Sequence, residues 1–226
     1  PASEVHYKGH TLERAIEALC DNHDPFYQEA RHAVREFGEL AIPSLLHRLK
    51  ETEKDSFEFD CERICGEVLS ELKPVPPSLI DPLVQVIKAR GYSSSYQSGN
   101  MTVGEHGVFL VMYRIGTPGA PMYIAFAREH EDVTLRRWFI HVLAYLTSSD
   151  DALDCLLEML GDEQCAGEAV NSLKIALSDL LADPKFPARL LEKLERGNAL
   201  ERRSAAQVFR GYSGFPRVYN TFGATP

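Results

Sequence analysis

The chain has 226 residues, 44% of them apolar, which is enough for one sizeable core or for a stack of about five helix pairs. Its 33 Asp and Glu residues against 24 Lys and Arg residues give a net charge of −9, which would repel a phosphate backbone and argues against nucleic acid as a partner. No apolar run is long enough to cross a bilayer, and the first ten residues contain no apolar signal core, so we expect no membrane partner.

A short helix is predicted first, from Thr11 to Cys20, as part of an N-terminal cap over residues 1–24. Asp24 and Pro25 then supply an N-cap and a proline at the first helical position. Two stretches with helical apolar spacing follow between Phe26 and Lys50, separated by Gly38. Neither helix can bury its apolar stripe alone, so units of this kind are expected to stack on their neighbours.

The same pattern recurs along the chain, and it predicts about five helix pairs within residues 25–197. After the first pair, the copies are expected at residues 57–87, 101–126, 132–160 and 166–194. Residues expected to be buried between the stacked pairs are Leu45, Leu46, Leu83, Phe139, Leu143, Leu156 and Leu173. Asn198 to Phe209 begins a sixth pair, and the aromatic tail after it is expected to dock as a cap, so that residues 198–226 close the array.

Two departures from the pattern are informative. The segment Gly91 to Asn100 has the composition of a loop, and it is the longest insertion in the array. Gly104 and Gly107 weaken the start of the next helix by roughly 1 kcal/mol each relative to alanine. Small residues at these positions would let another backbone approach closely.

The residues Ala33-Val34, Gly38, Ala41-Ile42-Pro43 and Leu45-Leu46-x-x-Leu49 resemble the HEAT repeat, and the likeness extends over about Phe26 to Arg210. This resemblance implies an all-α fold, a right-handed α-α superhelix of about five helix pairs plus terminal caps, forming one solenoid over residues 1–226. Family members also place an aspartate before the first helix of a pair and an arginine within it. Asp132 with Arg136-Arg137, and Asn198 with Arg202-Arg203, look like those positions.

In the HEAT family the second helices usually line the concave surface. If the likeness holds for this chain, several charged and polar side chains of its second helices lie toward the concave groove or its edge. They are Arg48, Lys50, Asp81, Gln85, Lys88, Tyr123, Arg128, Asp154, Glu158, Arg189 and Lys193.

HEAT-like proteins include three kinds of enzyme or chaperone. Di-iron proteins use His-Glu dipeptides, and this chain has none. DNA glycosylases need a basic groove with tryptophans, whereas the single Trp138 lies in an apolar stripe that favours core packing. Bilin lyases have similar repeats, but no chemical signature of theirs can be carried over to this chain. His141 lies on the same predicted helix as Trp138, and no Ser or Cys stands near it at a suggestive position. We therefore expect it to be a satisfied or exposed histidine rather than a catalytic base. We therefore expect no catalytic residue and no cofactor, with a bilin-lyase-like or glycosylase-like activity as the alternative.

The cysteines are odd in number and lie within apolar helical patterns, which favours reduced thiols and a cytoplasmic location. They are Cys20, Cys61, Cys65, Cys155 and Cys165. Cys61 and Cys65 share a helix face and could form half of a metal site. Burial as small apolar residues is the stronger interpretation, so no metal is expected.

An acidic concentration at the fourth pair gives the clearest indication of function. Asp150, Asp151, Asp154 and Glu158 alternate with leucines and are expected on the solvent face, either as a solvated surface or as a landing strip for a basic protein. We expect a protein-binding module, an adaptor or a small immunity-type inhibitor. The remaining expected binding residues are Tyr92 and Tyr96 in the loop, and Tyr123 and Arg128 in the third pair.

Overall fold

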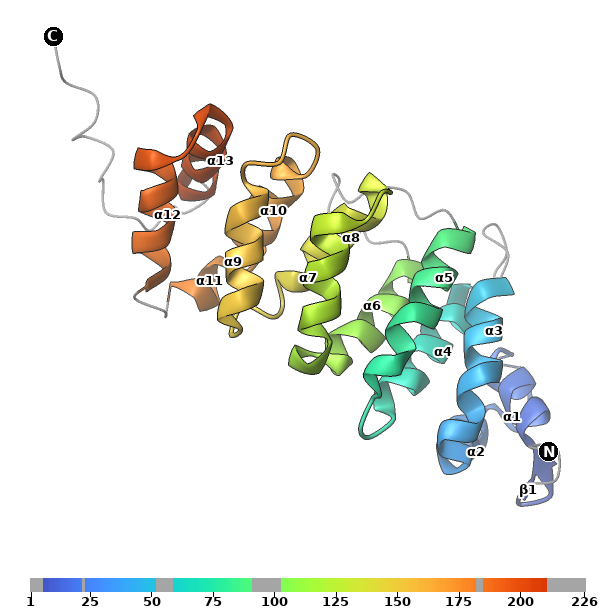
Figure 1. Cartoon of the computed structure of the whole chain (residues 1–226). Coiled ribbons are helices and arrows are strands. Elements are labelled where there is room, and N and C mark those ends of the chain that lie inside the picture. Colours follow the sequence, from blue (N-terminus) through green and yellow to red (C-terminus); the bar gives the residue numbers. More distant parts are fainter. Residues whose placement is uncertain (1–5, 22, 52–58, 91–102, 182–184, 211–226) are drawn as a thin grey trace, which may run out of the picture. The chain divides into compact units, whose positions relative to one another are not determined.

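The computed structural model describes residues 6–21, 23–51, 59–90, 103–181 and 185–210. These residues are predominantly helical, which confirms the all-α prediction (Figure 1). The α-helices are α1 (Leu12–Leu19), α2 (Tyr27–Phe37), α3 (Ile42–Glu51), α4 (Phe59–Glu71), α5 (Ile80–Arg90), α6 (Val103–Ile115), α7 (Ala120–Glu129), α8 (Val133–Leu143), α9 (Asp150–Met159), α10 (Ala166–Ile175), α11 (Leu177–Leu180), α12 (Lys185–Arg196) and α13 (Ala199–Arg210). Short 3-10 helices are η2 (Gly38–Ala41), η3 (Pro77–Leu79) and η5 (Thr117–Gly119).

The chain divides into two compact units, residues 1–119 and 120–226. The division follows η5, in the turn of the predicted third helix pair. In the first unit, α4 packs against α2 and α6, while α3 packs against α1 and α5. In the second unit, α10 packs against α8 and α13, while α7 packs against α9. Within each unit, first helices therefore contact first helices of the next pair and second helices contact second helices.

Local sequence signals account for several helix ends. Thr11 caps α1 by accepting a hydrogen bond from the Arg14 backbone N–H at 3.2 Å. Asp132 caps α8 in the same way, accepting from Thr134 N–H at 2.8 Å. Gly38 ends α2 with a φ of 57°, a conformation that a side chain would disfavour. Each of these boundaries lies where the sequence predicts it. The predicted start of α2 is wrong: the helix begins at Tyr27, and Asp24 and Pro25 lie in the turn before it, where Asp24 Oδ1 accepts from the Phe26 N–H at 2.8 Å.

Helix α13 begins with a capping box. The Asn198 side chain accepts from the Glu201 N–H at 2.9 Å, and the Glu201 side chain accepts in return from the Asn198 N–H at 2.8 Å. The start predicted at Asn198 is thus confirmed. The tail after Arg210 and the loop Gly91 to Asn100 lie outside the described residues, and so does the expected docking of that tail.

A two-stranded hairpin precedes α1 and was not expected from the sequence. Its strands are β1 (His6–Tyr7) and β2 (His10–Thr11), joined through Lys8 and Gly9, which both have positive φ. The His10 ring stacks on Phe26 with centroids 4.0 Å apart, which seats the hairpin against the start of α2.

The buried residues agree closely with the predicted set. Leu45, Leu83, Phe139, Leu143, Leu156 and Leu173 are all buried, and so is Trp138. Leu46 is the exception: it is only half-buried, because it lies beside the inward stripe formed by Leu45 and Leu49 on α3. No helix in the described part of the chain is long and apolar enough to span a membrane.

Candidate functional site

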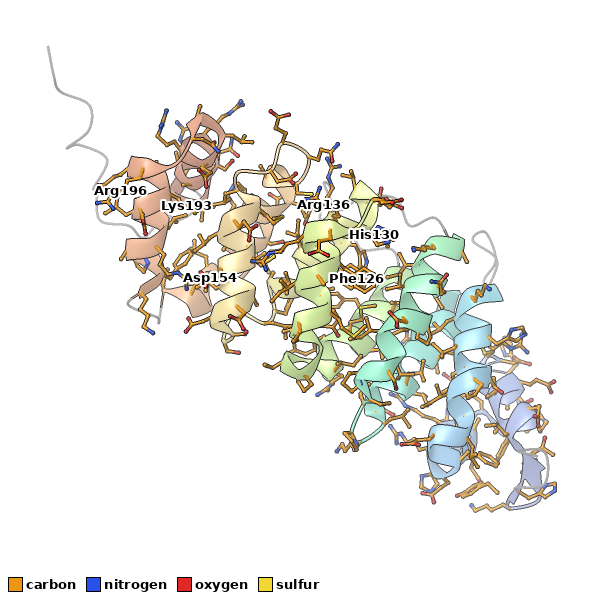
Figure 2. All side chains as sticks on the ribbon, viewed as in Figure 1. Phe126, His130, Arg136, Asp154, Lys193 and Arg196 are labelled. Atoms are coloured by element: carbon orange, nitrogen blue, oxygen red, sulfur yellow. A yellow bond between two sulfur atoms is a disulfide. The ribbon has the colours of Figure 1, made fainter. Side chains whose placement is uncertain are left out.

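The four acidic residues expected at the surface lie on one face of α9. Leu153, Leu156, Leu157 and Leu160 are buried, and this turns Asp150, Asp151, Asp154 and Glu158 outward. Two arginines from neighbouring helices join them, Arg128 on α7 and Arg189 on α12. We call these six residues the charged face. Figure 2 shows Asp154 on α9 among the side chains of the second unit.

Both arginines of the charged face are engaged by its carboxylates. Arg128 donates from Nε and Nη2 to Glu158 Oε2, at 2.9 and 2.6 Å. Arg189 contacts Asp154, and its Nη1 lies 3.6 Å from Asp150 Oδ1. Ion pairs thereby connect α7 to α9 and α9 to α12 across the surface. Among the ion pairs of the described residues, none includes Asp151.

These ion pairs are exposed, so their contribution to stability is small. The side chains of Arg128 and Glu158 keep 41% and 53% of their exposure, and exposed pairs typically contribute about 0–1 kcal/mol. The hydrogen bonds that Arg128 donates to Glu158 raise the pKa of Arg128, which therefore stays charged. Four carboxylates and two guanidinium groups leave the charged face with a net charge of −2.

The remaining predicted binding residues have different outcomes. Tyr92 and Tyr96 lie outside the described residues. Tyr123 was expected at the groove, and this is wrong: its side chain is fully buried, and its ring stacks on Phe139 at 5.8 Å. Burial also raises its pKa, as expected for a phenol removed from water. Helix α7 therefore presents Arg128, but not Tyr123, at the surface.

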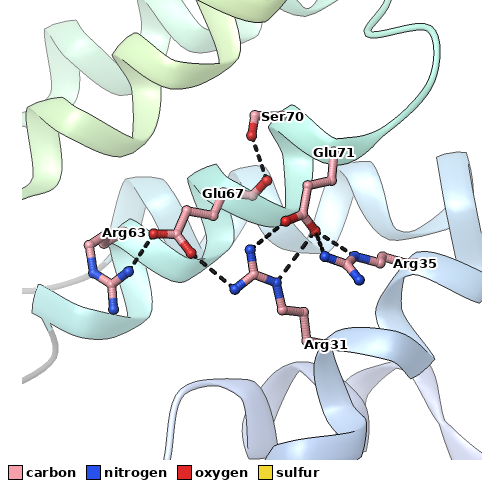
Figure 3. Close-up of polar contacts among 6 residues, drawn as sticks. All are labelled: Arg31, Arg35, Arg63, Glu67, Ser70 and Glu71. Atoms are coloured by element: carbon pink, nitrogen blue, oxygen red, sulfur yellow. Dashed lines mark hydrogen bonds and ion pairs between the residues drawn. The ribbon is translucent and has the colours of Figure 1, made fainter.

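A second polar cluster lies in the first unit, between α2 and α4 (Figure 3). Arg31 contacts Glu67, with Nη1 3.1 Å from Oε2, and also contacts Glu71. Arg35 contacts Glu71 as well, and Arg63 pairs with Glu67 along α4. Burial alone would raise the pKa of Glu71, but the hydrogen bonds from Arg31 and Arg35 outweigh it and lower that pKa. This cluster fixes α2 against α4.

A pocket of about 770 Å³ lies beside this cluster, at the ends of α4 and α6. Its charged lining residues are Arg35, Glu71, Lys73 and Arg114. Glu71 already engages Arg35, and both Lys73 and Arg114 are exposed to solvent. Two solvated cations hold a carboxylate only weakly, so the pocket is a poorer candidate than the charged face.

A polar contact also links α8 to the turn before α10. Arg136 on α8 contacts Asp162, and the Asp162 side chain accepts hydrogen bonds from the Gln164 and Cys165 N–H groups at 2.9 Å each. Burial alone would raise the pKa of Asp162, but the hydrogen bonds from Arg136 and from the two backbone N–H groups outweigh burial and lower that pKa. His141, also on α8, is buried rather than exposed, with Nδ1 3.5 Å from Glu168 Oε1. Both contacts connect consecutive first helices.

The cysteines correct one expectation. Cys20 and Cys61 form a disulfide, so the prediction that all five thiols are reduced is wrong. The two residues are 41 positions apart, and they meet because α1 packs against α4. Cys65 lies one helical turn from Cys61, which brings three sulfurs together in the core of the first unit. Cys155 and Cys165 are buried thiols of the second unit.

Comparisons with protein-family models, curated proteins and solved structures find no match to this chain.

Proposed function

We propose that the chain is a HEAT-like solenoid module that binds another protein, with basic groups on that partner meeting the charged face. The observation that carries the proposal is the set of ion pairs Arg128–Glu158 and Arg189–Asp154, which span three second helices at the surface. In HEAT-like arrays the second helices usually line the concave surface. The residues of the charged face lie at the solvent-exposed surface of three second helices, α7, α9 and α12.

These ion pairs are weak enough for a basic group of the partner to take the place of Arg128 or Arg189. Exposed ion pairs contribute about 0–1 kcal/mol each, so replacing an internal arginine by a partner's lysine or arginine costs the fold little. The net charge of −2 and the carboxylate of Asp151, which takes part in none of the ion pairs described above, favour a basic partner. Charges of this kind raise the association rate more than the affinity.

The link between Arg136 and Asp162 supports the HEAT-like part of the proposal. Asp162 precedes one first helix, and Arg136 lies within the previous one, which is the placement that the HEAT resemblance implies for its Asp–Arg contacts. Packing of first helices on first helices in both units agrees with such an array. The right-handed superhelix and the single solenoid over residues 1–226 are parts of this proposal.

Affinity capture with matched variants tests the function. The parent protein and the double variant Asp151→Lys/Asp154→Lys are immobilised and exposed to lysate of the native cell, and the captured proteins are quantified by mass spectrometry. We expect a basic protein that the parent retains and that the double variant loses by about tenfold or more.

A charge-matched control separates the site from the overall charge. Glu13 and Glu39 are exposed residues of the first unit, and Glu13→Lys/Glu39→Lys changes the net charge by the same amount. This control should capture the partner as the parent does. Equal loss in both double variants would indicate bulk electrostatics and would contradict a binding site on the charged face.

A further inference from the structure

Three cysteine sulfurs meet in the first unit, at the contact between α1 and α4. Cys20 follows the last residue of α1, while Cys61 and Cys65 lie one turn apart on α4. The three Sγ atoms all lie within 4.8 Å of one another. This is the one group of three potential metal-binding side chains among the residues that the structure describes.

The spacing of the sulfurs fits a metal centre. Zinc–sulfur bonds are about 2.3 Å long, so two thiolates on one tetrahedral or trigonal ion lie about 3.8–4.0 Å apart. Cys61 and Cys65 Sγ are 3.9 Å apart. The disulfide holds Cys20 Sγ closer to Cys61 than a metal would, and breaking that bond removes the restraint.

The surroundings of the cluster favour a metal that binds thiolates. Cys65 is fully buried, Cys61 is 4% exposed, and Cys20 is half-buried at the end of α1. Buried thiolates need a compensating positive charge, and thiolate ligands select soft ions such as Zn²⁺ and Cu⁺. The half-buried Cys20 gives such an ion a route from solvent.

We propose that reduction of the Cys20–Cys61 disulfide converts this cluster into a binding site for one thiophilic ion, Zn²⁺ or Cu⁺. A dithiol reductant supplies two electrons and two protons, the disulfide becomes two thiols, and the reductant leaves as its own disulfide. Metal binding then displaces the thiol protons to solvent and forms three metal–sulfur bonds. The oxidised protein holds two of these sulfurs in the disulfide, so redox state controls access to the site.

Metal titration of the full chain tests this site without reference to any protein partner. Reduced protein, freed of reductant under anaerobic conditions, is titrated with Zn²⁺ and separately with Cu⁺, each against a competing chromophoric chelator. We expect one tightly bound ion per chain for at least one of the two metals, and no tight binding by the oxidised protein.

Two sets of variants locate the site. Cys65→Ser should weaken binding by the reduced protein at least about tenfold, whereas Cys155→Ser and Cys165→Ser, which alter buried thiols of the second unit, should leave it unchanged. Circular dichroism of each oxidised variant checks that it is folded, and the oxidised parent is a control that needs no mutation. The proposal is overturned if the reduced parent binds neither ion, or if Cys65→Ser binds as tightly as the parent.

Discussion

Gly66 of α4 lies directly against Gly107 of α6. A Cβ atom at position 66 would come within 2.3 Å of the Gly107 Cα and 2.6 Å of its carbonyl oxygen, distances that real Cβ atoms do not adopt. The two helix backbones therefore approach as closely as they do because neither residue has a side chain. The close approach expected from the small residues of this helix is confirmed at Gly107.

Replacing Gly66 by alanine should destabilise the first unit. The added methyl group meets backbone atoms, which cannot rotate away, so α4 and α6 must separate at a cost of about 1–3 kcal/mol or more. Denaturant unfolding followed by circular dichroism measures this loss.

Gly167→Ala is the matched control for that experiment. Gly167 lies in the first turn of α10, and a Cβ there would meet nothing within 4 Å. It should stabilise the protein by about 0.5–1 kcal/mol, because alanine is the better helix former. Equal effects of the two substitutions would contradict the Gly66–Gly107 contact.

Leu143→Ala should cost about 2–5 kcal/mol of unfolding free energy, since Leu143 is completely buried on α8 and its truncation leaves a cavity. Leu40, which is 50% exposed, provides the control, and its substitution by alanine should change stability by less than about 0.5 kcal/mol. A loss below 1 kcal/mol for Leu143→Ala would refute its assigned place in the core.

The stability of the second unit should depend on pH through Asp162. Because the folded protein lowers the pKa of this carboxyl below its ordinary value, the stabilisation is fully present above about pH 4 and is lost as the pH falls through the folded pKa. Asp162→Asn should lower stability at pH 7 and flatten the acid limb of the stability curve. Urea unfolding between pH 2 and pH 7, followed for the parent and this variant, measures both effects, and an unchanged acid limb would exclude this role for Asp162.

The ion pair between Arg128 and Glu158 should be energetically weak. A double-mutant cycle with Arg128→Ala and Glu158→Ala is expected to give a coupling below about 1 kcal/mol, and lower at high salt, because both side chains are exposed. A coupling of several kcal/mol would mean that the pair is structural, and that a partner could not displace Arg128 at low cost.

The sequence predicted the helices because apolar spacing and capping residues are local signals. Gly38, Asp132 and Asn198 each mark a boundary through the conformation or hydrogen bond that their own residue type provides. The burial of Phe139 and Leu143 follows from the same periodicity.

What the sequence missed depends on contacts between distant segments. The disulfide needs Cys20 and Cys61 to meet across the contact between α1 and α4, which spacing alone does not reveal. Tyr123 was misplaced because a phenol is compatible with either a surface or a core, and only its packing on Phe139 decides between them. The hairpin at Lys8 and Gly9 is too short to show a period of two.

The pairing of the acidic residues was also missed. Asp154 and Glu158 were correctly placed on the exposed face of α9, but their partners Arg189 and Arg128 lie on other helices. The HEAT resemblance places both arginines on the same surface as the acidic residues, and this was the one signal that could have indicated the pairing. The resemblance does not show that the two arginines neutralise half of the four carboxylates.

The most direct test of the account is the association rate of the captured partner, measured by stopped flow at low and at physiological salt. If the charged face steers a basic protein, the rate for the parent should fall steeply as salt shortens the screening length to about 8 Å. Asp151→Lys/Asp154→Lys should already associate slowly at low salt and show a flatter salt dependence, while Glu13→Lys/Glu39→Lys should behave like the parent. If Asp151→Lys/Asp154→Lys associates at the parental rate with the parental salt slope, the charged face is only a solvated surface, and the proposed binding function is contradicted.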